Sequence, residues 1–382
     1  MGAARRSAST LAIAFALAFI TTAAGITEER RPLRDGRQFD PGTLMAQRAA
    51  GAPEQLDQLR DWLGGWDVQY ATHDDSGHVH VAHGRAVITL MNRGHAFMER
   101  FHSEDFDGNG NALSTLAFVV YNPTGDVWGL GEANSFTEHI TVHTGKTGAD
   151  GLELYDAVRR RGGPSITHSR LRLRVVDAGH FELRREEALD RLNSWKTKVV
   201  KTYTRSAAPA AIFSATSNYG TPAPGVPPEA RQFDFLLGEW SMQHDMTFPN
   251  GQQVSFPVSG TGVHALDGHA IMEFNWYDVD PQLPDAATTI VRLYNRQTRS
   301  WECMYLTNRF NNLLHFGGVR EGDKIVLHQF NADASDAPIS YWTFHDMKPD
   351  AYGWYANTSR DRGATFQKTW IIAATRKAPV DP

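Results

Sequence analysis

Apolar and polar residues alternate with a period of two along most of the chain. The runs His78–Leu90, Ser169–Val176 and Thr197–Thr204 show this pattern, and turn residues such as Gly, Asn and Pro separate runs of this kind. Such alternation is typical of β-strands, whose successive side chains point to opposite faces of a sheet. Roughly nine or ten runs occur in each half of the chain, at the spacing of β-sandwiches and barrels. The pattern therefore predicts an all-β protein.

Two copies of one unit make up most of the chain. The motif Leu-Gly-x-Trp occurs at Leu63–Trp66 and again, 174 residues later, at Leu237–Trp240. The segment Gly-His-Ala-x-Met-Glu occurs at Gly94–Glu99 and, at the same offset, at Gly268–Glu273. The repeated unit of about 150 residues is too long for a solenoid repeat and has the size of a whole domain.

Each copy begins with a short helical pattern, Pro53–Leu63 or Pro228–Leu237, and continues with the alternating runs. One helix followed by about ten meandering strands favours a closed up-and-down barrel, because closure removes the exposed edges of a flat sheet. We therefore predict two tandem closed antiparallel β-barrels of lipocalin-like form, each with a short N-terminal helix. A barrel of this size has an interior wide enough for a small ligand.

Composition divides the chain into five segments. Residues 1–25 combine an arginine pair, a short apolar run and small residues, which is the pattern of a secretory signal peptide. Residues 26–52 are polar and predict an irregular arm, and residues 206–227 are rich in Pro and Ala and predict a linker. Residues 53–205 and 228–377 form the two predicted barrels. Because each has its own helix and full set of strands, we expect each to fold alone.

Charge and cysteine content narrow the expected partners and compartment. The net charge is -5, with both signs mixed and no basic block, so neither nucleic acid nor an anionic membrane surface is an expected partner. No second apolar run is long enough for a membrane span. The lone Cys303 excludes a disulfide within the chain. We expect export to the periplasm or secretion, by a general or a twin-arginine route, and the oligomeric state stays open.

The repeated motifs resemble those of the lipocalin and fatty-acid-binding (calycin) superfamily, in which a short helix precedes a Gly-x-Trp at the first strand. The segments Phe233–Met242 and Gly268–Phe274 are similar to bacterial lipocalin-like domains of the DUF1579 type. The resemblance covers both copies and implies a barrel fold, but a fold does not fix a function.

The resemblance implies structural roles for the motif residues. In copy one, Trp66 would cap one end of the barrel, and Gly64 would let the helix backbone pass close to the first strand. Arg205 ends the last strand, which lies beside the first strand in a closed barrel, so we expect it to stack on the tryptophan. The corresponding residues of copy two are Gly238, Trp240 and Arg376.

Glu99 and Glu273 are the carboxylates that recur in the repeat. Each lies two residues after a bulky apolar residue, Phe97 or Ile271. If that face points inward, each barrel holds a glutamate in an apolar cavity, where burial raises its pKa and suits it to act as a general acid or base. Replacing it with leucine would then be neutral or stabilising. If Met98 and its counterpart point inward instead, the glutamates are solvated.

His95 and His269 also recur, each after a glycine, which places them near a turn. They are candidates for catalysis, or they hydrogen-bond to loop backbone. On one strand face, His95 and Glu99 would lie about 13 Å apart at 3.3 Å per residue, so they cannot form a direct acid–base pair.

Metal and cofactor motifs are weak in this sequence. His78 and His80 share a strand face that could hold a metal ion, but copy two lacks the corresponding histidines, which favours a solvated hairpin. The final strands lack the histidine that haem barrels of the nitrobindin type place there. Neither a catalytic serine motif nor a phosphate loop occurs. We therefore expect no metal and no cofactor.

Three functions fit these observations. The first is an exported protein that binds a small, mostly apolar molecule in one or both barrel cavities. The second is a cofactor-independent enzyme, of the isomerase, cyclase or hydratase type, that uses a cavity with Glu99 or Glu273. The third is a structural or interaction module with filled barrels. The sequence does not identify the ligand.

Overall fold

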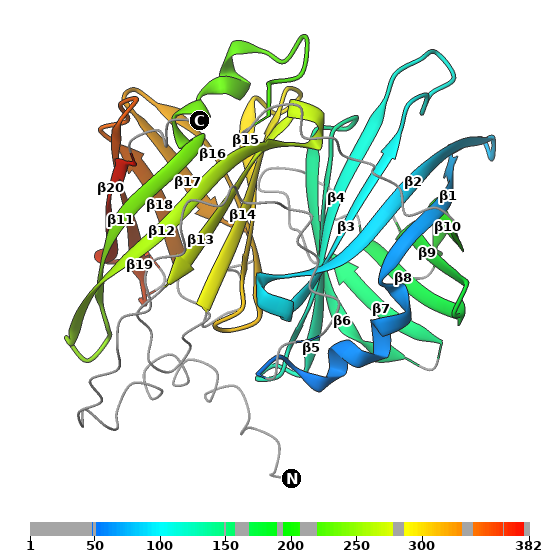
Figure 1. Ribbon diagram of the computed structural model, residues 1–382, viewed down its shortest axis with the longest axis horizontal. Helices are drawn as coiled ribbons and strands as arrows, with labels where there is room; N and C mark the ends of the chain where they lie inside the picture. The colour runs from blue at the N-terminus through cyan, green and yellow to red at the C-terminus, as the bar shows by residue number, and fades with distance from the viewer. Residues whose placement is uncertain are drawn as a thin grey trace.

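Twenty β-strands form two closed barrels, one from each copy of the repeat (Figure 1). In each barrel every strand pairs antiparallel with the next one along the chain, and the tenth strand pairs with the first. The predicted all-β fold of two tandem closed antiparallel barrels is thus confirmed. This computed structural model describes residues 48, 51–148, 150–156, 168–188, 194–206, 220–277, 286–330, 339–361 and 363–377.

The strand boundaries follow the alternating runs of the sequence. Barrel 1 consists of β1 (Gly64–His73), β2 (Val79–Met91), β3 (Ala96–Ser103), β4 (Leu113–Asn122), β5 (Val127–Asn134), β6 (His139–Gly148), β7 (Gly151–Asp156), β8 (His168–Asp177), β9 (His180–Ala188) and β10 (Lys196–Arg205). Barrel 2 consists of β11 (Gly238–Thr247), β12 (Gln253–Ala265), β13 (Ala270–Tyr277), β14 (Ala286–Asn295), β15 (Ser300–Thr307), β16 (Asn312–Glu321), β17 (Lys324–Gln329), β18 (Ile339–His345), β19 (Ala351–Ser359) and β20 (Gln367–Arg376).

The helix before each barrel is a 3₁₀ helix. In barrel 1 it is η1 (Glu54–Trp62), and it buries Leu56, Leu59 and Trp62. This spacing of three residues matches the three residues per turn of a 3₁₀ helix, so one face meets the barrel end. Before barrel 2, the predicted helix is divided into two short turns, η3 (Pro228–Arg231) and η4 (Asp234–Leu236).

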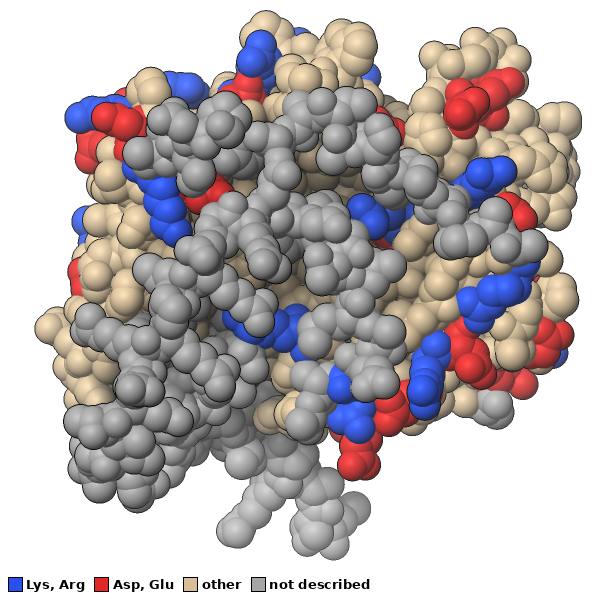
Figure 2. Space-filling view, viewed as in Figure 1, with Lys and Arg blue, Asp and Glu red and all other residues tan. Residues whose placement is uncertain are grey.

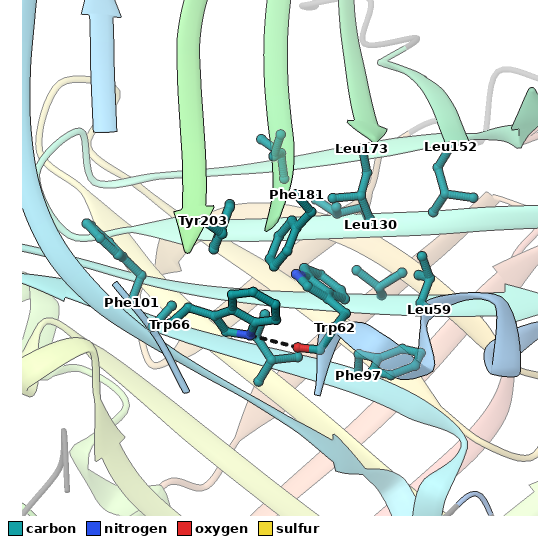
Figure 3. Packing of buried hydrophobic residues seen from close by; sticks show 14 of the residues in the cluster. Leu59, Trp62, Trp66, Phe97, Phe101, Leu130, Leu152, Leu173, Phe181 and Tyr203 are labelled. Carbon is teal, nitrogen blue, oxygen red and sulfur yellow. Dashed lines mark hydrogen bonds between the residues drawn. The ribbon is translucent and has the colours of Figure 1, made fainter. Parts of the chain in front are cut away.

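A tryptophan and an arginine close the end of each barrel next to these helices. In barrel 1, Trp66 is fully buried and its indole N–H donates to the Trp62 carbonyl at 2.8 Å (Figure 3). The Arg205 guanidinium lies 3.8 Å from the centre of the Trp66 ring and donates to the Leu63 carbonyl. Barrel 2 repeats the arrangement: Trp240 donates to the Leu236 carbonyl at 2.9 Å, and Arg376 lies 4.4 Å from the ring centre.

The glycine of each Gly-x-Trp motif makes room for this arginine. Gly64 has a φ of +121° and Gly238 a φ of +96°, a region that favours glycine. A Cβ atom on Gly64 would lie 2.6 Å from Arg205 Nη1, and one on Gly238 would lie 2.4 Å from Arg376 Nη1. The motif glycine therefore serves both the backbone turn and the seat of the guanidinium.

The two barrels share a hydrophobic core. It lies between the outer faces of β3–β6 and β13–β15, and its buried residues come from both barrels. They are Met91, Ala96, Met98, Leu116, Phe118, Val120, Ala133, Ile140 and Val142 of barrel 1, and Leu266, Ala270, Met272, Phe274, Val291, Leu293, Met304 and Leu306 of barrel 2. Separating the copies would expose this surface to water, which argues against the expectation that each folds alone.

Polar contacts surround the shared core, and two equivalent turns supply many of them. In barrel 1 the turn η2 (Asn92–Gly94) reaches barrel 2, where Asn92 Oδ1 accepts from the Thr289 hydroxyl at 2.7 Å. In barrel 2 the turn η5 (Leu266–Gly268) reaches barrel 1, where Asp267 lies 2.9 Å from His102 Nδ1. Each turn has three consecutive residues at positive φ. The repeated glycine before each histidine is therefore part of a turn that docks on the other barrel.

Two features concern membranes and surface charge. Within the described part of the chain, none of the helices is long and apolar enough to cross a membrane. On the face shown in Figure 2, acidic and basic side chains are interspersed rather than gathered into fields of one sign. The predicted signal peptide at residues 1–25 lies outside the described residues.

Candidate functional site

The repeated glutamates point into the barrels. Glu99 on β3 is 1% exposed and Glu273 on β13 is 6% exposed. Phe97 and Ile271, two residues earlier on the same faces, belong to the interior cores of the two barrels. Met98 points the other way, into the shared core between the barrels. Of the two orientations that the sequence left open, the structure therefore has the inward one.

In barrel 1 the glutamate belongs to a cluster of charged and hydroxyl groups. Lys201 on β10 is 1% exposed, and its Nζ lies 2.5 Å from Glu132 Oε2 and 3.5 Å from Glu99 Oε1. The Tyr203 hydroxyl donates to Glu99 Oε1 at 2.8 Å. The lysine therefore lies between two carboxylates, one from β3 and one from β5.

Burial and charge act in opposite directions on this cluster. Burial raises the pKa of Glu99, against the lowering effect of the Lys201 ammonium. Burial alone would lower the pKa of Lys201, but the carboxylates of Glu132 and Glu99 raise it above its usual value. The lysine is thus held in its charged form, in which it is neither a nucleophile nor a base.

In barrel 2 the corresponding glutamate has a different partner. Arg292 on β14 is 2% exposed, and its Nη1 lies 2.8 Å from Glu273 Oε2. Asn275 Nδ2 donates to Glu273 Oε1 at 2.8 Å. The guanidinium also lies 5.1 Å from the ring centre of Phe233 and 5.3 Å from that of Phe344. Each candidate catalytic glutamate therefore has a cation beside it inside its own barrel.

The cations were not predicted from the sequence, because they do not recur in the repeat. Lys201 corresponds to Ile372 in copy two, and Arg292 corresponds to Val119 in copy one. A usable signal was present in strand parity: Lys201 shares a face with Val199 and Tyr203, and all three are buried. A charged residue at an inward position of a strand requires a partner inside the barrel.

Barrel 2 contains a cavity beside its ion pair. The cavity has a volume of about 30 Å³, which is room for about one or two water molecules. Its lining is mainly aromatic, with a few polar groups. The polar and ionisable lining residues are His244, Glu273, Asn275, Thr288 and Arg292, and the aromatic ones are Tyr277, Tyr305, Trp342, Phe344, Tyr352, Trp354 and Trp370.

His244 contributes a hydrogen-bond donor to this cavity. Burial lowers its pKa to about 3, so the ring is neutral near pH 7. The Trp370 indole N–H donates to His244 Nδ1 at 3.2 Å, which requires the remaining ring proton to be on Nε2. Among the described residues, neither His244 Nε2 nor Asn275 Oδ1 has a hydrogen-bond partner. The same holds for four more atoms of the cavity wall: Thr288 Oγ1, Arg292 Nε, and the ion-paired atoms Arg292 Nη1 and Glu273 Oε2. The cavity wall thus holds both donors and acceptors that are buried without a hydrogen-bond partner.

Barrel 1 fills the equivalent space with its own side chains. Tyr70, Phe101 and Lys201 occupy the positions that correspond to His244, Asn275 and Ile372 of barrel 2. Lys201 Nζ lies 5.3 Å from the Tyr70 ring centre and 5.6 Å from the Phe101 ring centre. The long lysine and two aromatic rings thus replace a histidine, an asparagine and an isoleucine.

The repeated histidines lie outside both barrel interiors. His95 Nδ1 is 3.1 Å from Asn311 Oδ1 of barrel 2, so it contributes to the contact between barrels. His269 follows the equivalent turn η5 and is half-buried there. Neither lies beside the glutamate of its own copy, and their placement therefore gives no support to a catalytic role.

The histidine-rich hairpin of copy one carries no metal arrangement. His80 Nε2 is paired with the Phe106 carbonyl. Among the described residues, His, Cys, Asp and Glu side chains form no group of three that could hold a metal ion.

A larger hollow lies on the outside of barrel 1. It is open, measures about 1080 Å³, and is lined by the outer faces of β1, β2, β3 and β10. Asp67 and Arg85 in its wall lie 3.8 Å apart and are both well exposed. Ligand sites are usually enclosed and lined mainly by apolar side chains, and this hollow is open, so the smaller interior cavity is the better candidate site despite its size.

Comparisons with known proteins give no family for this chain. No family model and no curated protein matches it. A crystal structure of a protein of unknown function from the DUF3598 family of Nostoc punctiforme matches 85% of this chain and 100% of its own, at 10% identity and a TM-score of 0.25. A structure titled as a putative AttH from Nitrosomonas europaea matches 86% of this chain and 98% of its own, at 8% identity and a TM-score of 0.14.

A third similar structure is a mutant of transferrin binding protein B from Haemophilus parasuis. It matches 82% of this chain and 76% of its own, at 7% identity and a TM-score of 0.15. TM-scores this low carry no argument about function, so the site must be interpreted from its own chemistry.

Proposed function

We propose that this protein binds a small molecule inside barrel 2, and that barrel 1 is a filled barrel that supports it. The observation that carries the proposal is the aromatic cavity whose wall has several polar atoms without a hydrogen-bond partner, among them His244 Nε2 and Asn275 Oδ1. A buried donor or acceptor without a partner costs stability, and such costs are common where a ligand supplies the missing hydrogen bond. Barrel 1, in contrast, has Tyr70, Phe101 and Lys201 in the same place.

A ligand larger than about two water molecules requires side chains at the cavity to move. Phe256 suits this role, because it is half-buried and its ring centre lies 5.4 Å from that of His244 and 5.9 Å from that of Tyr277, both residues of the cavity wall. Rotation of this ring toward solvent would give His244 and Tyr277 room to move outward and would enlarge the cavity, while Trp370 keeps its hydrogen bond to His244.

The test uses a matched pair of threonines. Thr288 lines the cavity of barrel 2, and Thr115 is the equivalent residue of barrel 1; both are buried. Native mass spectrometry of protein from its own host should show a bound mass that denaturation releases. Thr288→Leu fills the cavity and should abolish that mass, whereas Thr115→Leu should retain it. A wild-type protein without a bound mass, or a mass retained by Thr288→Leu, contradicts the proposal.

A filled-barrel structural or interaction module is the second candidate, and the small volume of the cavity favours it. Under this function the wild-type protein carries no ligand. Thr288→Leu should then raise the free energy of unfolding by up to about 1 kcal/mol, because it fills a void without displacing anything. Chemical denaturation of the purified variant distinguishes this outcome from ligand loss.

We further infer that the protein is an exported, lipocalin-like member of the calycin superfamily, close to domains of the DUF1579 type. The support is the Gly-x-Trp motif, the preceding helix and the arginine beside the tryptophan in each copy, together with the signal-peptide pattern of residues 1–25. N-terminal sequencing of the mature protein from the periplasm or medium tests export. An unprocessed N-terminus on cytoplasmic protein would contradict it.

A further inference from the structure

We infer that the ligand of barrel 2 is an uncharged, flat molecule that presents a hydrogen-bond acceptor to His244 and a donor to Asn275. The inference rests on the proposed function and adds the chemical class of the ligand. Three properties of the cavity lead to it: the charge balance of its wall, the identity of its free polar atoms, and the shape of its apolar side chains.

The charge balance favours a neutral ligand. Glu273 and Arg292 pair with each other at 2.8 Å, so the wall has no net charge from them. His244 is neutral because burial lowers its pKa to about 3, and burial raises the pKa of the lining tyrosines, Tyr277 to about 12. An ionised ligand would lose its hydration here without gaining a counter-charge.

The free polar atoms of the wall favour a ligand that both donates and accepts. Thr288 Oγ1 and Arg292 Nε are free beside the ion pair, and His244 Nε2 and Asn275 Oδ1 provide a donor and an acceptor away from it. His244 Nε2 carries the proton, because its Nδ1 accepts from Trp370. Asn275 Nδ2 donates to Glu273, so the free Oδ1 of the same amide is an acceptor. Both side chains are more than nine-tenths buried and line the same cavity. A carboxamide, lactam or similar group satisfies both atoms at once.

The apolar walls suit a ring. Trp342 and Trp354 lie edge to face with centres 5.4 Å apart, and Trp354 and Trp370 do the same at 5.5 Å. Tyr305 adds a further edge against Trp342 at 5.2 Å. Aromatic side chains arranged in this way accept a flat ring by offset stacking or edge contacts.

Three probes with the same ring separate these properties. Benzamide carries an acceptor and a donor, benzoate carries a charge, and toluene carries neither. Isothermal titration calorimetry on the full-length protein at pH 7 should show benzamide binding at least roughly tenfold tighter than benzoate and tighter than toluene. His244→Phe and Asn275→Leu should each weaken benzamide roughly tenfold and leave toluene unchanged within about twofold.

His143→Phe is the matched control, since His143 is a fully buried histidine of barrel 1 whose Nε2 lies 2.9 Å from the Ser169 hydroxyl. It should change none of the three affinities. Thermal unfolding and near-ultraviolet circular dichroism identify variants that fail to fold. An independent readout needs no variant: benzamide affinity of the wild-type protein should be equal at pH 5 and pH 8, because His244 does not titrate there.

The outcomes distinguish failure of this inference from failure of the proposed function. Benzoate binding as tightly as benzamide shows that Arg292 is available to an anion and overturns the inference. Toluene binding as tightly as benzamide overturns it too, and leaves a purely apolar ligand for the same site. Absence of binding by all three probes contradicts the proposed function itself.

Discussion

The two repeated glutamates occupy the same place in their barrels but depend on different cations. Glu273 pairs with the cation of Arg292, which has no second carboxylate in the cavity wall. Glu99 shares Lys201 with Glu132. The parity of Phe97 was compatible with the inward orientation, but the equally apolar Met98 left the outward orientation open. The structure argues against the expectation that replacement by leucine is neutral or stabilising, because each glutamate has a buried cation as its partner. These cations do not recur in the repeat, so the sequence comparison did not reveal them.

Glu273→Leu should lower the free energy of unfolding by about 3–5 kcal/mol, because it leaves the Arg292 charge buried and unpaired. Glu99→Leu should cost clearly less, because Lys201 keeps Glu132 at 2.5 Å. Urea denaturation of the two variants provides the comparison. The double variant Glu273→Leu/Arg292→Leu should recover much of the loss. Equal losses for both single variants would contradict the assigned pairings.

The tryptophans at the closed barrel ends are a second case at this scale. Trp66→Ala and Trp240→Ala should each cost about 3–5 kcal/mol, the range for deleting a fully buried large aromatic side chain. Trp195 is the control, because Arg170 lies 4.3 Å from its ring centre but the indole is only half-buried. Trp195→Ala should cost about 1 kcal/mol or less. Denaturant midpoints that are alike for all three would mean that the barrel ends need no indole.

At the scale of the elements, the positions of the strands could be predicted from the sequence. The contacts that their outward faces make with the other barrel could be predicted only in part. The period of two places β1 and β10 correctly, because one face of each is core and the other is solvent. Strand β4 is different: from Leu113 to Tyr121 every side chain is buried. Its continuous apolar run from Leu116 to Tyr121 was the available sign that both faces are covered. The turns η2 and η5 carry Gly-His-Ala, but their reach to the other barrel depends on tertiary packing that no local pattern encodes.

The contact between turn η5 and β3 should make stability depend on pH. The hydrogen bond that His102 donates to Asp267 raises the pKa of His102 and lowers the pKa of Asp267. The histidine contribution is complete below its unfolded pKa of about 6.5 and is lost as the pH rises through the raised folded value. The aspartate contribution is complete above its unfolded pKa of about 3.9 and is lost as the pH falls through the lowered folded value. The pair is therefore strongest between about pH 4 and pH 6.5.

Asp267→Asn tests this dependence without disturbing the turn, because asparagine tolerates the φ of +52° found there. From pH 5.5 to pH 8.5, the wild-type protein should lose up to about 1 kcal/mol more stability than the variant, since both side chains are partly exposed. Urea midpoints at the two pH values give the difference. A variant with the same pH dependence as the wild-type protein would show that the pair contributes nothing measurable.

At the scale of the whole molecule, the repeat predicts two barrels but does not predict that they pack against each other through a shared core. The proline-rich linker and the complete strand sets indicate two independent domains. The structure instead buries outward-facing methionines, phenylalanine and β-branched residues of both copies in one shared core. Such residues on the outer face of an isolated barrel would form an exposed apolar surface. Their outward parity, Met98 and Met272 beside the inward glutamates, is the detail in the sequence from which the union could have been inferred.

The separated copies should therefore depend on each other. Residues 51–206 and residues 220–377, produced as single fragments, should each aggregate or self-associate, because the surface of the shared core has no cover. Produced together, they should form a soluble 1:1 complex held by the same face. Size-exclusion chromatography with light scattering measures both results.

The variant Met98→Glu with Met272→Lys offers a check within the intact chain. Charges buried at this face should destabilise the protein strongly. The same charges on an outer face exposed to solvent would change stability by less than about 0.5 kcal/mol. Two fragments that are each folded and monomeric would show that the barrels are independent domains after all.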